Sequence, residues 1–422
     1  MPEPTQPTDV TLSDATLPDA VAQDDPDGGR IVLVVLDGLG GLPHSDTGRT
    51  ELESARTPNL DALAARSSLG MLVPVAPGIT PGSGPGHLAL FGYDPERYTI
   101  GRGALSALGV GFELQRGDLA VRLNLATLDD QGRVTDRRAG RPSDEVAGQA
   151  VDRLREGLSQ PPGLQLFVEP EKEHRAVLIL RPRPGDGDAP ELDDRIRDTD
   201  PQTTGVAPHA PEALVPEAEA TSEILDAVLG QAREILAGGD PINGVLARGF
   251  AVYRGFPGLR ERFGLRGVVV ARYPMYRGVA RLVGMEVAGE PTSDDGAVRM
   301  LEEAFGAYDF HFLHYKDPDA RGEDGDFDAK VRAIEAADEW MARIAALEPE
   351  VLLVTGDHST PAAMGTHSWH PVPVLLHSRR ARPTADGFGE STCRGGDIGQ
   401  IRTRHLMSLA LAHAGRLDKY GA

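Results

Sequence analysis

The chain of 422 residues contains a single cysteine, Cys393, few aromatic residues, and fewer lysine and arginine residues (43) than aspartate and glutamate residues (64). One cysteine excludes a disulfide scaffold and a metal site built from thiolates, and it fits a reducing, cytoplasmic compartment. The formal net charge of −21 argues against a broad surface for nucleic acid or for an anionic membrane. We therefore expect neither kind of partner, although local basic clusters could still bind small anions.

Long apolar runs are also missing. No uninterrupted apolar stretch reaches the ~20 residues that span a bilayer, and the N-terminus lacks the basic-then-apolar order of a secretion signal. Residues 1–29 are rich in Asp, Pro, Thr and Gln, which predicts a disordered acidic tail. The remaining chain is long enough for one large domain or two ordinary ones, and its sequence leaves the oligomeric state open, a homo-oligomer included.

Short apolar runs recur in the first and last parts of the chain. Ile31–Leu36 reads IVLVVL, Gly267–Ala271 reads GVVVA, and similar runs cover Phe310–Tyr315 and the residues from Val351 to Thr355. Continuous apolar character is typical of strands buried on both faces of a sheet. Because helical patterns separate these strands, the sequence predicts an α/β fold with a doubly wound sheet.

Polar side chains follow three of these strands. They are Asp37 after the first, Asp319 and Glu323 after the run that ends at Tyr315, and Asp357, His358 and His367 after Thr355. Open α/β sheets place their ligands at the carboxyl ends of strands. Carboxylates and imidazoles without cysteine suit Mn²⁺, Mg²⁺ or Zn²⁺. Helix-capping aspartates, polar loop histidines, a solvated acidic loop and a calcium loop remain alternatives.

A serine lies between glycines in the stretch TPGSGPGHLALFGYDP. Ser83 precedes a helix expected at His87–Phe91, and its small neighbours let a phosphate or a metal approach the hydroxyl. The alternative is a flexible loop with a capping serine. Ser83 becomes a candidate nucleophile if a metal lowers its pKa.

Composition changes within residues 108–242, where we expect an inserted smaller α/β domain. A core made of residues 30–107 and 243–422 would flank it. Strands are predicted at 120–128 and 175–180, and a helix at 143–158. The insert carries arginines suited to carboxylate or phosphate, of which Arg122 and Arg138 lie near apolar strand residues.

The motifs DGLGG, TPNLDALA, PGSGPGHLALFGYDP, GDHSTP and HSWHPVP, in this order, resemble the alkaline phosphatase superfamily. Within it the chain is most similar to the archaeal-type 2,3-bisphosphoglycerate-independent phosphoglycerate mutases. The similarity runs from about Ile31 to Leu409 and includes the insert, with VRLNLATLDDQGRVTDRRAGR, HRAVLILR and DTDP.

The resemblance implies a two-metal mechanism in the cytoplasm, with Mn²⁺ as the first expectation and no need for 2,3-bisphosphoglycerate. Ser83 would take the phosphoryl group of 3-phosphoglycerate and return it to the 2-hydroxyl of the reoriented glycerate. One metal would be held by Asp37, Ser83, Asp357 and His358, and the other by Asp319, Glu323 and His367. Substrate contacts would come from Arg122, Arg138, Arg141, Arg248 and Arg277.

Three positions depart from the family pattern. Glu323 stands where a histidine is usual, which makes the second site harder and favours Mn²⁺ or Mg²⁺ over Zn²⁺. Gly84 replaces an aspartate, and Arg277 replaces a lysine expected to contact the phosphoryl group. Alternatives to a mutase are therefore a metal-dependent phosphohydrolase or phosphotransferase, and a binding protein without catalysis.

Overall fold

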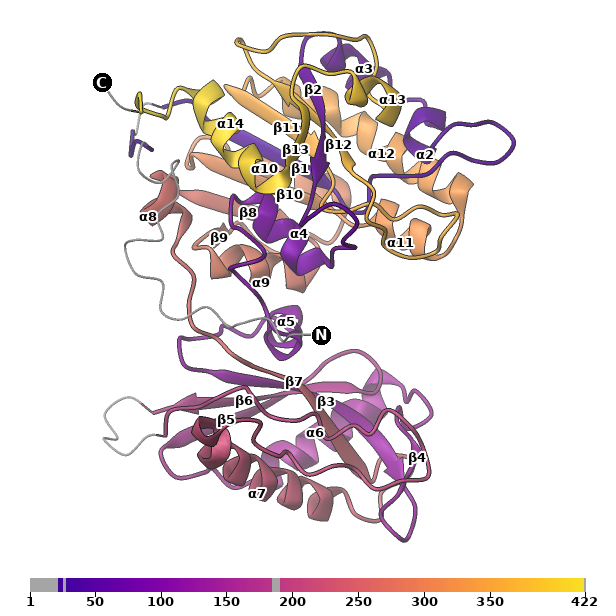
Figure 1. Cartoon of the computed structure of the whole chain (residues 1–422), viewed down its shortest axis with the longest axis vertical. Coiled ribbons are helices and arrows are strands. Elements are labelled where there is room, and N and C mark those ends of the chain that lie inside the picture. The colour runs from indigo at the N-terminus through magenta and orange to yellow at the C-terminus, as the bar shows by residue number, and fades with distance from the viewer. Residues whose placement is uncertain (1–21, 26–27, 184–189, 421–422) are drawn as a thin grey trace. The chain divides into compact units, whose positions relative to one another are not determined.

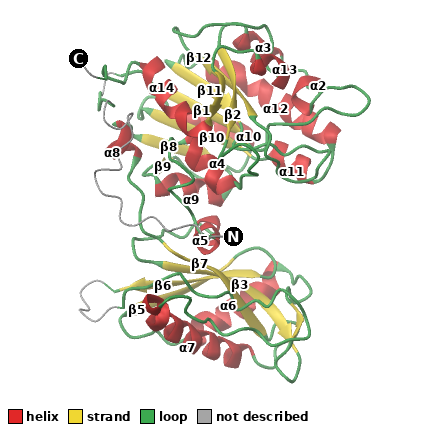
Figure 2. Cartoon of the chain, viewed as in Figure 1, coloured by secondary structure: helices red, strands yellow, loops and turns green. Residues whose placement is uncertain are grey.

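The computed structural model describes residues 22–25, 28–183 and 190–420, which form two compact units (Figures 1 and 2). The first unit contains the described residues up to Thr99, Phe256–Tyr273, and the described residues from Val279 onward. The second contains Ile100–Gly255, without the undescribed residues 184–189, and Pro274–Gly278. No helix in these described ranges has both the length and the apolar character needed to cross a bilayer.

The first unit is built around one mixed sheet of eight strands among the described residues. Their order is β13-β2-β12-β11-β1-β10-β8-β9, and β12 alone of these runs against its neighbours. β1 lies between β10 and β11, parallel to both, so the carboxyl ends of these three strands meet at one edge. The bounds are β1 Ile31–Leu36, β2 Ser68–Val73, β8 Gly267–Ala271, β9 Glu286–Val287, β10 Phe310–Tyr315, β11 Val351–Thr355, β12 Val372–His377 and β13 Gly399–Arg402.

Helices cover both faces of this sheet (Figure 1). Val32, Val34 and Leu36 of β1 belong to a buried cluster that includes residues of α3, α10 and α12. α14 packs against β1 and β11 with side chains outside that cluster, as expected for a doubly wound arrangement. The bounds are α2 Glu51–Ser54, α3 Pro58–Ala64, α4 Ser83–Leu90, α8 Leu259–Phe263, α9 Pro274–Leu282, α10 Asp294–Ala304, α11 Asp317–Glu323, α12 Phe327–Ala345, α13 Glu390–Arg394, η3 Thr403–His405 and α14 Leu406–Ala414. The first part of α9, Pro274–Gly278, belongs to the second unit.

The second unit has an antiparallel sheet and a core of its own. β3 is its longest strand; β6 pairs with one side of it and β7 with the other. Leu123, Leu154, Leu178 and Leu229 share the buried cluster that joins this sheet to α6 and α7. The bounds are α5 Arg102–Gly109, β3 Leu119–Leu128, β4 Val134–Asp136, α6 Asp144–Gly157, β5 Leu164–Pro170, β6 Arg175–Pro182, η2 Pro216–Ala218, α7 Glu219–Leu236 and β7 Gly244–Val252.

The predicted limits of the insert, 108–242, are narrower than the second unit. β7 was expected to belong to the core, but it pairs with β3 from Leu119 to Ala126, so its backbone hydrogen bonds belong to the second unit. α5 joins the same unit because it packs against β3 and β7. The sequence pattern of a strand does not indicate which other strand it pairs with. The boundary predicted from the sequence was wrong for this reason.

One other local prediction was wrong. The stretch after β10 was expected to be a loop, yet residues 317–323 form α11, with Pro318 in the first turn where proline is tolerated. In the C-terminal stretch, β13 and η3 precede α14.

The predicted disordered tail falls mainly on residues 1–21 and 26–27, outside the described residues. The rest of it is held against the C-terminal part of the chain. Arg416 is fully buried and donates hydrogen bonds to the carbonyls of Gly28 (3.1 Å) and Gly29 (2.9 Å), and Gln23 N donates to Arg416 O (3.0 Å). The prediction of disorder was therefore wrong for residues 22–25 and 28–29.

Candidate metal centre and anion pocket

The first candidate metal group lies where β1 and β11 end. Asp37 follows β1, Asp357 and His358 follow β11, and all three side chains are fully buried. One ligand atom from each lies within 4.8 Å of the others. Nε2 of His358 is 3.4 Å from Oδ1 of Asp37 and 3.2 Å from Oδ2 of Asp357. The pairing of β1 with β11 thus brings together residues that are far apart in sequence.

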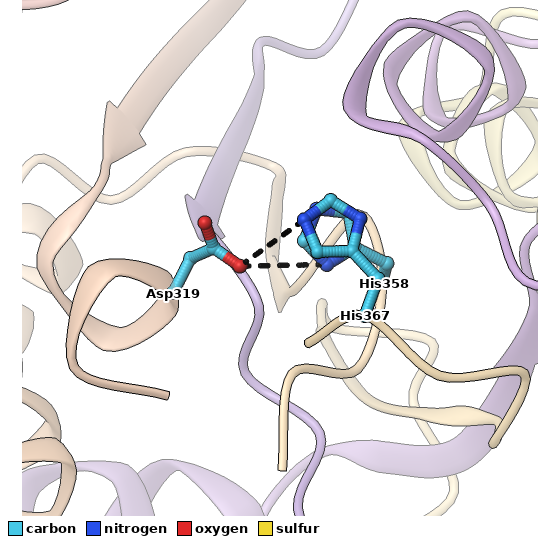
Figure 3. A group of neighbouring side chains, drawn as sticks. All are labelled: Asp319, His358 and His367. Carbon is cyan, nitrogen blue, oxygen red and sulfur yellow. Dashed lines mark ion pairs between the residues drawn. The ribbon is translucent and has the colours of Figure 1, made fainter. Parts of the chain in front are cut away.

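A second group consists of Asp319, His358 and His367 (Figure 3). Asp319 Oδ1 lies 3.8 Å from His358 Nδ1 and 3.6 Å from His367 Nε2. The two imidazole rings stack with their centroids 3.7 Å apart, facing the carboxylate (Figure 3). His358 belongs to both groups, so the two candidate metal positions are adjacent.

Ser83 is the first residue of α4, although the sequence predicted a helix beginning only at His87. Its Oγ lies 3.4 Å from Nε2 of His358, which places the hydroxyl beside the first group. The free amides at a helix N-terminus favour an anion at this position. Gly86 allows the close packing of α4, because a Cβ there would lie 2.6 Å from the carbonyl oxygen of Asp357.

Lys316 was not predicted as a site residue. Its Nζ lies 3.1 Å from Oδ2 of Asp37 and 2.6 Å from Oδ2 of Asp319, so the ammonium joins the two groups. Burial disfavours its charge, but the two carboxylates raise the pKa of Lys316 above its ordinary value. Burial likewise opposes ionisation of Asp37, yet His314 and Lys316 hold the pKa of that carboxyl well below its usual range.

Two further buried histidines stand behind the carboxylates. His314 Nε2 is 3.1 Å from Asp37 Oδ2, and His87 Nδ1 is 3.2 Å from Asp357 Oδ2. Burial lowers the pKa of His314, whereas Asp357 outweighs burial and raises the pKa of His87. Such outer contacts fix the orientation of metal ligands. Neither residue was predicted from the sequence, although His314 lies in β10 and His87 lies one helical turn after Ser83.

Glu323 faces the second group but is not one of its three closely spaced residues. Its Oε1 is 3.6 Å from Nε2 of His367, and its side chain is 53% exposed. The neighbouring acid Asp324 pairs instead with Arg321 at 3.1 Å. Coordination by Glu323 therefore stays a prediction.

The residues of both groups suit a divalent ion by their chemistry. They offer carboxylate oxygens and imidazole nitrogens, and Cys393 is buried in another part of the unit with the pKa of its thiol raised by burial to about 12. This oxygen and nitrogen set fits Mn²⁺, Mg²⁺ or Zn²⁺. Burying several carboxylates together is costly unless cations neutralise them, which supports the same conclusion.

A separate cavity of about 390 Å³ lies within the second unit. Four of the five arginines predicted to bind substrate line it. Arg277 does not; it is buried in α9, and its predicted contact with a phosphoryl group stays a prediction. The lining residues are Arg102, Arg122, Asn124, Arg137, Arg138, Arg141, Glu173, His174, Arg175 and Arg248.

The cavity carries a surplus of positive charge. Asp200 accepts two hydrogen bonds from Arg137 (2.8 and 2.7 Å) and one from Arg248 (3.2 Å), so one buried carboxylate orients two guanidinium groups. Burial and the other arginines lower the pKa of Arg122. Burial and the same positive surroundings lower the pKa of His174 to about 4, which keeps this imidazole neutral near pH 7. Guanidinium groups in this number suit a phosphate or a carboxylate ligand.

Among the lining residues, Arg102, Asn124, His174 and Arg175 were not predicted from the sequence. A signal existed for two of them. Asn124 lies two residues after Arg122 on the same face of β3, and Arg175 lies opposite Asn124 on β6. Arg102 comes from α5, which gave no recognised pattern.

Comparison with known proteins identifies the family of this chain. Residues 64–243 match the family model described as 2,3-bisphosphoglycerate-independent phosphoglycerate mutase. A protein of Thermus thermophilus, described as a probable 2,3-bisphosphoglycerate-independent phosphoglycerate mutase, is 48% identical over 397 residues, covering 93% of this chain and 96% of the relative. A relative from Deinococcus radiodurans with the same description is 46% identical over the same shares.

Two solved structures have a similar fold. A protein from Pyrococcus horikoshii superposes with a TM-score of 0.78 at 30% identity, over 94% of this chain and all of the other. The cofactor-independent phosphoglycerate mutase from Thermoplasma acidophilum superposes with a TM-score of 0.72 at 29% identity, over 92% and 100%. The chain therefore belongs to the archaeal-type family of 2,3-bisphosphoglycerate-independent phosphoglycerate mutases, which are isomerases of glycolysis.

Proposed function

We propose that this chain interconverts 3-phosphoglycerate and 2-phosphoglycerate in the cytoplasm through a phosphoserine at Ser83, with divalent ions at the two carboxylate–histidine groups. The observation that carries the proposal is the 3.4 Å distance between Ser83 Oγ and His358 Nε2. The hydroxyl thus lies directly beside buried residues of the kind that bind metals. A serine without such neighbours would be a poor nucleophile.

The first half of the reaction forms a bond from Ser83 Oγ to phosphorus and breaks the bond from phosphorus to the C3 oxygen. Ser83 Oγ loses its proton in this step, and the C3 oxygen gains one proton and leaves as a hydroxyl. In the second half the 2-hydroxyl of the glycerate attacks the phosphoserine, loses its proton, and restores the free serine. Bound divalent ions would lower the pKa of the serine hydroxyl and offset the charge on the phosphoryl oxygens.

The residues of the first unit have separate roles in this scheme. Asp37, Asp357 and His358 would hold one ion beside Ser83, and Asp319 and His367, with Glu323, would hold the other. Lys316 adds positive charge next to Asp37 and Asp319, within reach of a phosphoryl oxygen bound there. His314 and His87 keep the carboxylates of Asp37 and Asp357 in place.

The second unit supplies the other requirement, which is recognition of an anionic metabolite. A phosphoglycerate carries a carboxylate and a phosphate, and the arginine-lined cavity offers forked donors for such groups. We propose this unit as the substrate-binding domain, with Arg122, Arg138, Arg141 and Arg248 as contacts. Retention of glycerate while the phosphoserine waits is what separates a mutase from a phosphatase.

The test is ³¹P NMR of the enzyme loaded with Mn²⁺, freed of excess metal and given 3-phosphoglycerate. Aliquots are quenched with chelator, because bound Mn²⁺ broadens the signals. We expect 2-phosphoglycerate with little free phosphate. Free phosphate as the main product would mean that water reaches the phosphoserine and that the chain is a phosphohydrolase. Unchanged 3-phosphoglycerate would overturn the proposal and direct attention to Glu323, Gly84 and Arg277.

A further inference from the structure

A fully buried lysine lies beneath the candidate metal groups and belongs to neither of them. Lys330 of α12 has no exposed surface. Its Nζ donates hydrogen bonds to the carbonyl oxygens of Gly38 (2.9 Å), Gly40 (3.0 Å) and Thr360 (2.8 Å). An ammonium group has three protons to donate, so these three carbonyls use all of them. We call Lys330 and these three carbonyl groups the lysine clamp.

The lysine clamp joins two loops that each carry metal ligands. Gly38 and Gly40 follow Asp37 after β1, and Thr360 follows Asp357 and His358 after β11. The loops also touch directly, because Thr360 N lies 3.1 Å from Gly40 O and Gly38 N donates to Asp357 Oδ1 at 3.2 Å. The ammonium therefore fixes the spacing of the loops that hold the first group.

Thr360 extends the lysine clamp to the second group. Its Oγ1 donates to Asp319 Oδ1 at 2.5 Å and lies 3.0 Å from His358 Nδ1. The packing around it is close. A Cβ on Gly38 would lie 2.6 Å from Thr360 Oγ1, and one on Gly322 of α11 would lie 2.2 Å from the Thr360 carbonyl oxygen. The three ligand-bearing segments thus meet at a single threonine.

The surroundings explain how a charge is tolerated at this depth. Glu51 lies 3.9 Å from Lys330 Nζ and accepts a hydrogen bond from Ala362 N at 2.7 Å. A buried ammonium without hydrogen-bond acceptors and a nearby carboxylate is strongly destabilising, so this is a built arrangement and not an incidental surface pair.

We propose that Lys330 is a positioning residue for both candidate metal sites, acting through the carbonyls of Gly38, Gly40 and Thr360 and through the hydroxyl of Thr360. This inference rests on the proposed metal chemistry. Removing the ammonium frees the two loops to separate while every metal ligand is retained. Loss of a partner behind the metal ligands typically weakens metal binding about 10- to 100-fold.

The test compares Lys330→Met with Asp338→Leu. Both residues lie on α12 and are buried, but Asp338 caps α3 through Leu60 N (2.7 Å) and Asn59 N (3.2 Å) and touches no metal-bearing loop. Mn²⁺ binding is measured by electron paramagnetic resonance of the free ion, and thermal unfolding of the metal-free proteins is recorded in parallel. We expect Lys330→Met to weaken Mn²⁺ binding at least about tenfold. Asp338→Leu should lower the melting temperature and leave Mn²⁺ affinity as in the wild type.

A second pair of variants covers the case in which Lys330→Met does not fold. Thr360→Val keeps the carbonyl and the shape but lacks the hydroxyl, whereas Thr360→Ser keeps both polar groups. We expect weaker Mn²⁺ binding in Thr360→Val and near wild-type binding in Thr360→Ser. Wild-type Mn²⁺ affinity in Lys330→Met or in Thr360→Val, or an equal loss of affinity in Asp338→Leu, would overturn the positioning role. A wild-type protein that binds no Mn²⁺ would instead overturn the proposed metal chemistry, and the positioning role with it.

Discussion

Ser83 Oγ and His358 Nε2 lie 3.4 Å apart, and the same nitrogen is within 3.4 Å of Asp37 and 3.2 Å of Asp357. One imidazole nitrogen therefore has the hydroxyl and both carboxylates as immediate neighbours. An ion bound by these three ligands would lie next to the serine oxygen. The proposed nucleophile and the residues proposed to activate it therefore lie in one small cluster.

Ser83→Ala is expected to abolish turnover of 3-phosphoglycerate and to leave the fold intact, because it removes only a partly exposed oxygen at the start of α4. Steady-state assay and circular dichroism measure the two effects. Ser67→Ala serves as the control, since Ser67 is a buried serine whose hydroxyl donates to Leu63 O and lies near His377, away from both metal groups. Turnover retained in Ser83→Ala would exclude a phosphoserine route.

Glu323→His is expected to shift metal preference from Mn²⁺ toward Zn²⁺, because an imidazole is a softer ligand than a carboxylate. The bound metal is quantified by mass spectrometry after equilibration with both ions. Asp324→His is the matched control, since Asp324 is the next residue but pairs with Arg321 instead of facing His367. An identical metal profile in Glu323→His and the wild type would show that Glu323 is no ligand.

Arg248→Met is expected to raise KM for 3-phosphoglycerate at least about tenfold, because hydrogen bonds to charged groups contribute about 1.5–3 kcal/mol. Asp200 keeps its two hydrogen bonds from Arg137 in this variant, so the wall of the cavity is preserved. Arg254→Met removes a guanidinium that follows β7 but pairs with Asp194 outside the cavity lining, and its KM should stay at the wild-type value. Equal KM values for the two variants would remove Arg248 from the substrate site.

Glu390 makes the free energy of unfolding depend on pH. Burial raises the pKa of this carboxyl from 4.5 to about 7. The folded state therefore holds this proton more tightly than the unfolded state does. The contribution of Glu390 to the free energy of unfolding is fully present below pH 4.5 and is lost as pH rises through about 7. The loss amounts to roughly 3 to 4 kcal/mol, since one pKa unit corresponds to about 1.4 kcal/mol.

Glu390→Gln should flatten this part of the pH profile, because glutamine imitates the protonated carboxyl. Denaturant unfolding between about pH 5 and 8 measures the effect. Glu53→Gln is the control: burial opposes ionisation of Glu53, but hydrogen bonds from Ser391 lower its pKa. The contribution of Glu53 to the free energy of unfolding is therefore lost only as pH falls below the range of about pH 5 to 8. The same slope in Glu390→Gln as in the wild type would contradict the buried-carboxyl account.

Much of the first unit could be read from its sequence because each of its central strands is a continuous apolar run. Ile31–Leu36, Gly267–Ala271 and Phe310–Tyr315 match β1, β8 and β10 residue for residue. Parallel pairing then brings Asp37 and Asp357 to one sheet edge, as the position of each residue after a strand predicted. The chemistry of the site follows from residue types at strand ends, which a sequence displays openly.

Side chains that act behind the ligands could not be found in this way. His314 lies inside β10, where the sequence indicates an ordinary buried position. Lys330 lies within an amphipathic helix, where a lysine indicates an ordinary surface position. Their roles depend on which distant groups they meet, such as Asp37 or the Thr360 carbonyl. The pairing of Asp200 with Arg137 and Arg248 has the same character, because no local pattern encodes a contact between separate strands and loops.

The position of β1 between β10 and β11 has a consequence for the order in which the molecule is made. Ile31 pairs with Phe310 and Val351, so the first strand leaves the ribosome roughly 280 to 320 residues before its neighbours, a delay of roughly 15 to 60 s at the usual 5–20 residues per second. The strands of the second unit all lie between Leu119 and Val252 and are complete much earlier. A stalled or truncated nascent chain would therefore present Asp37 without Asp319 or Asp357. The two candidate metal groups therefore stay incomplete until His358 and His367 have been synthesised.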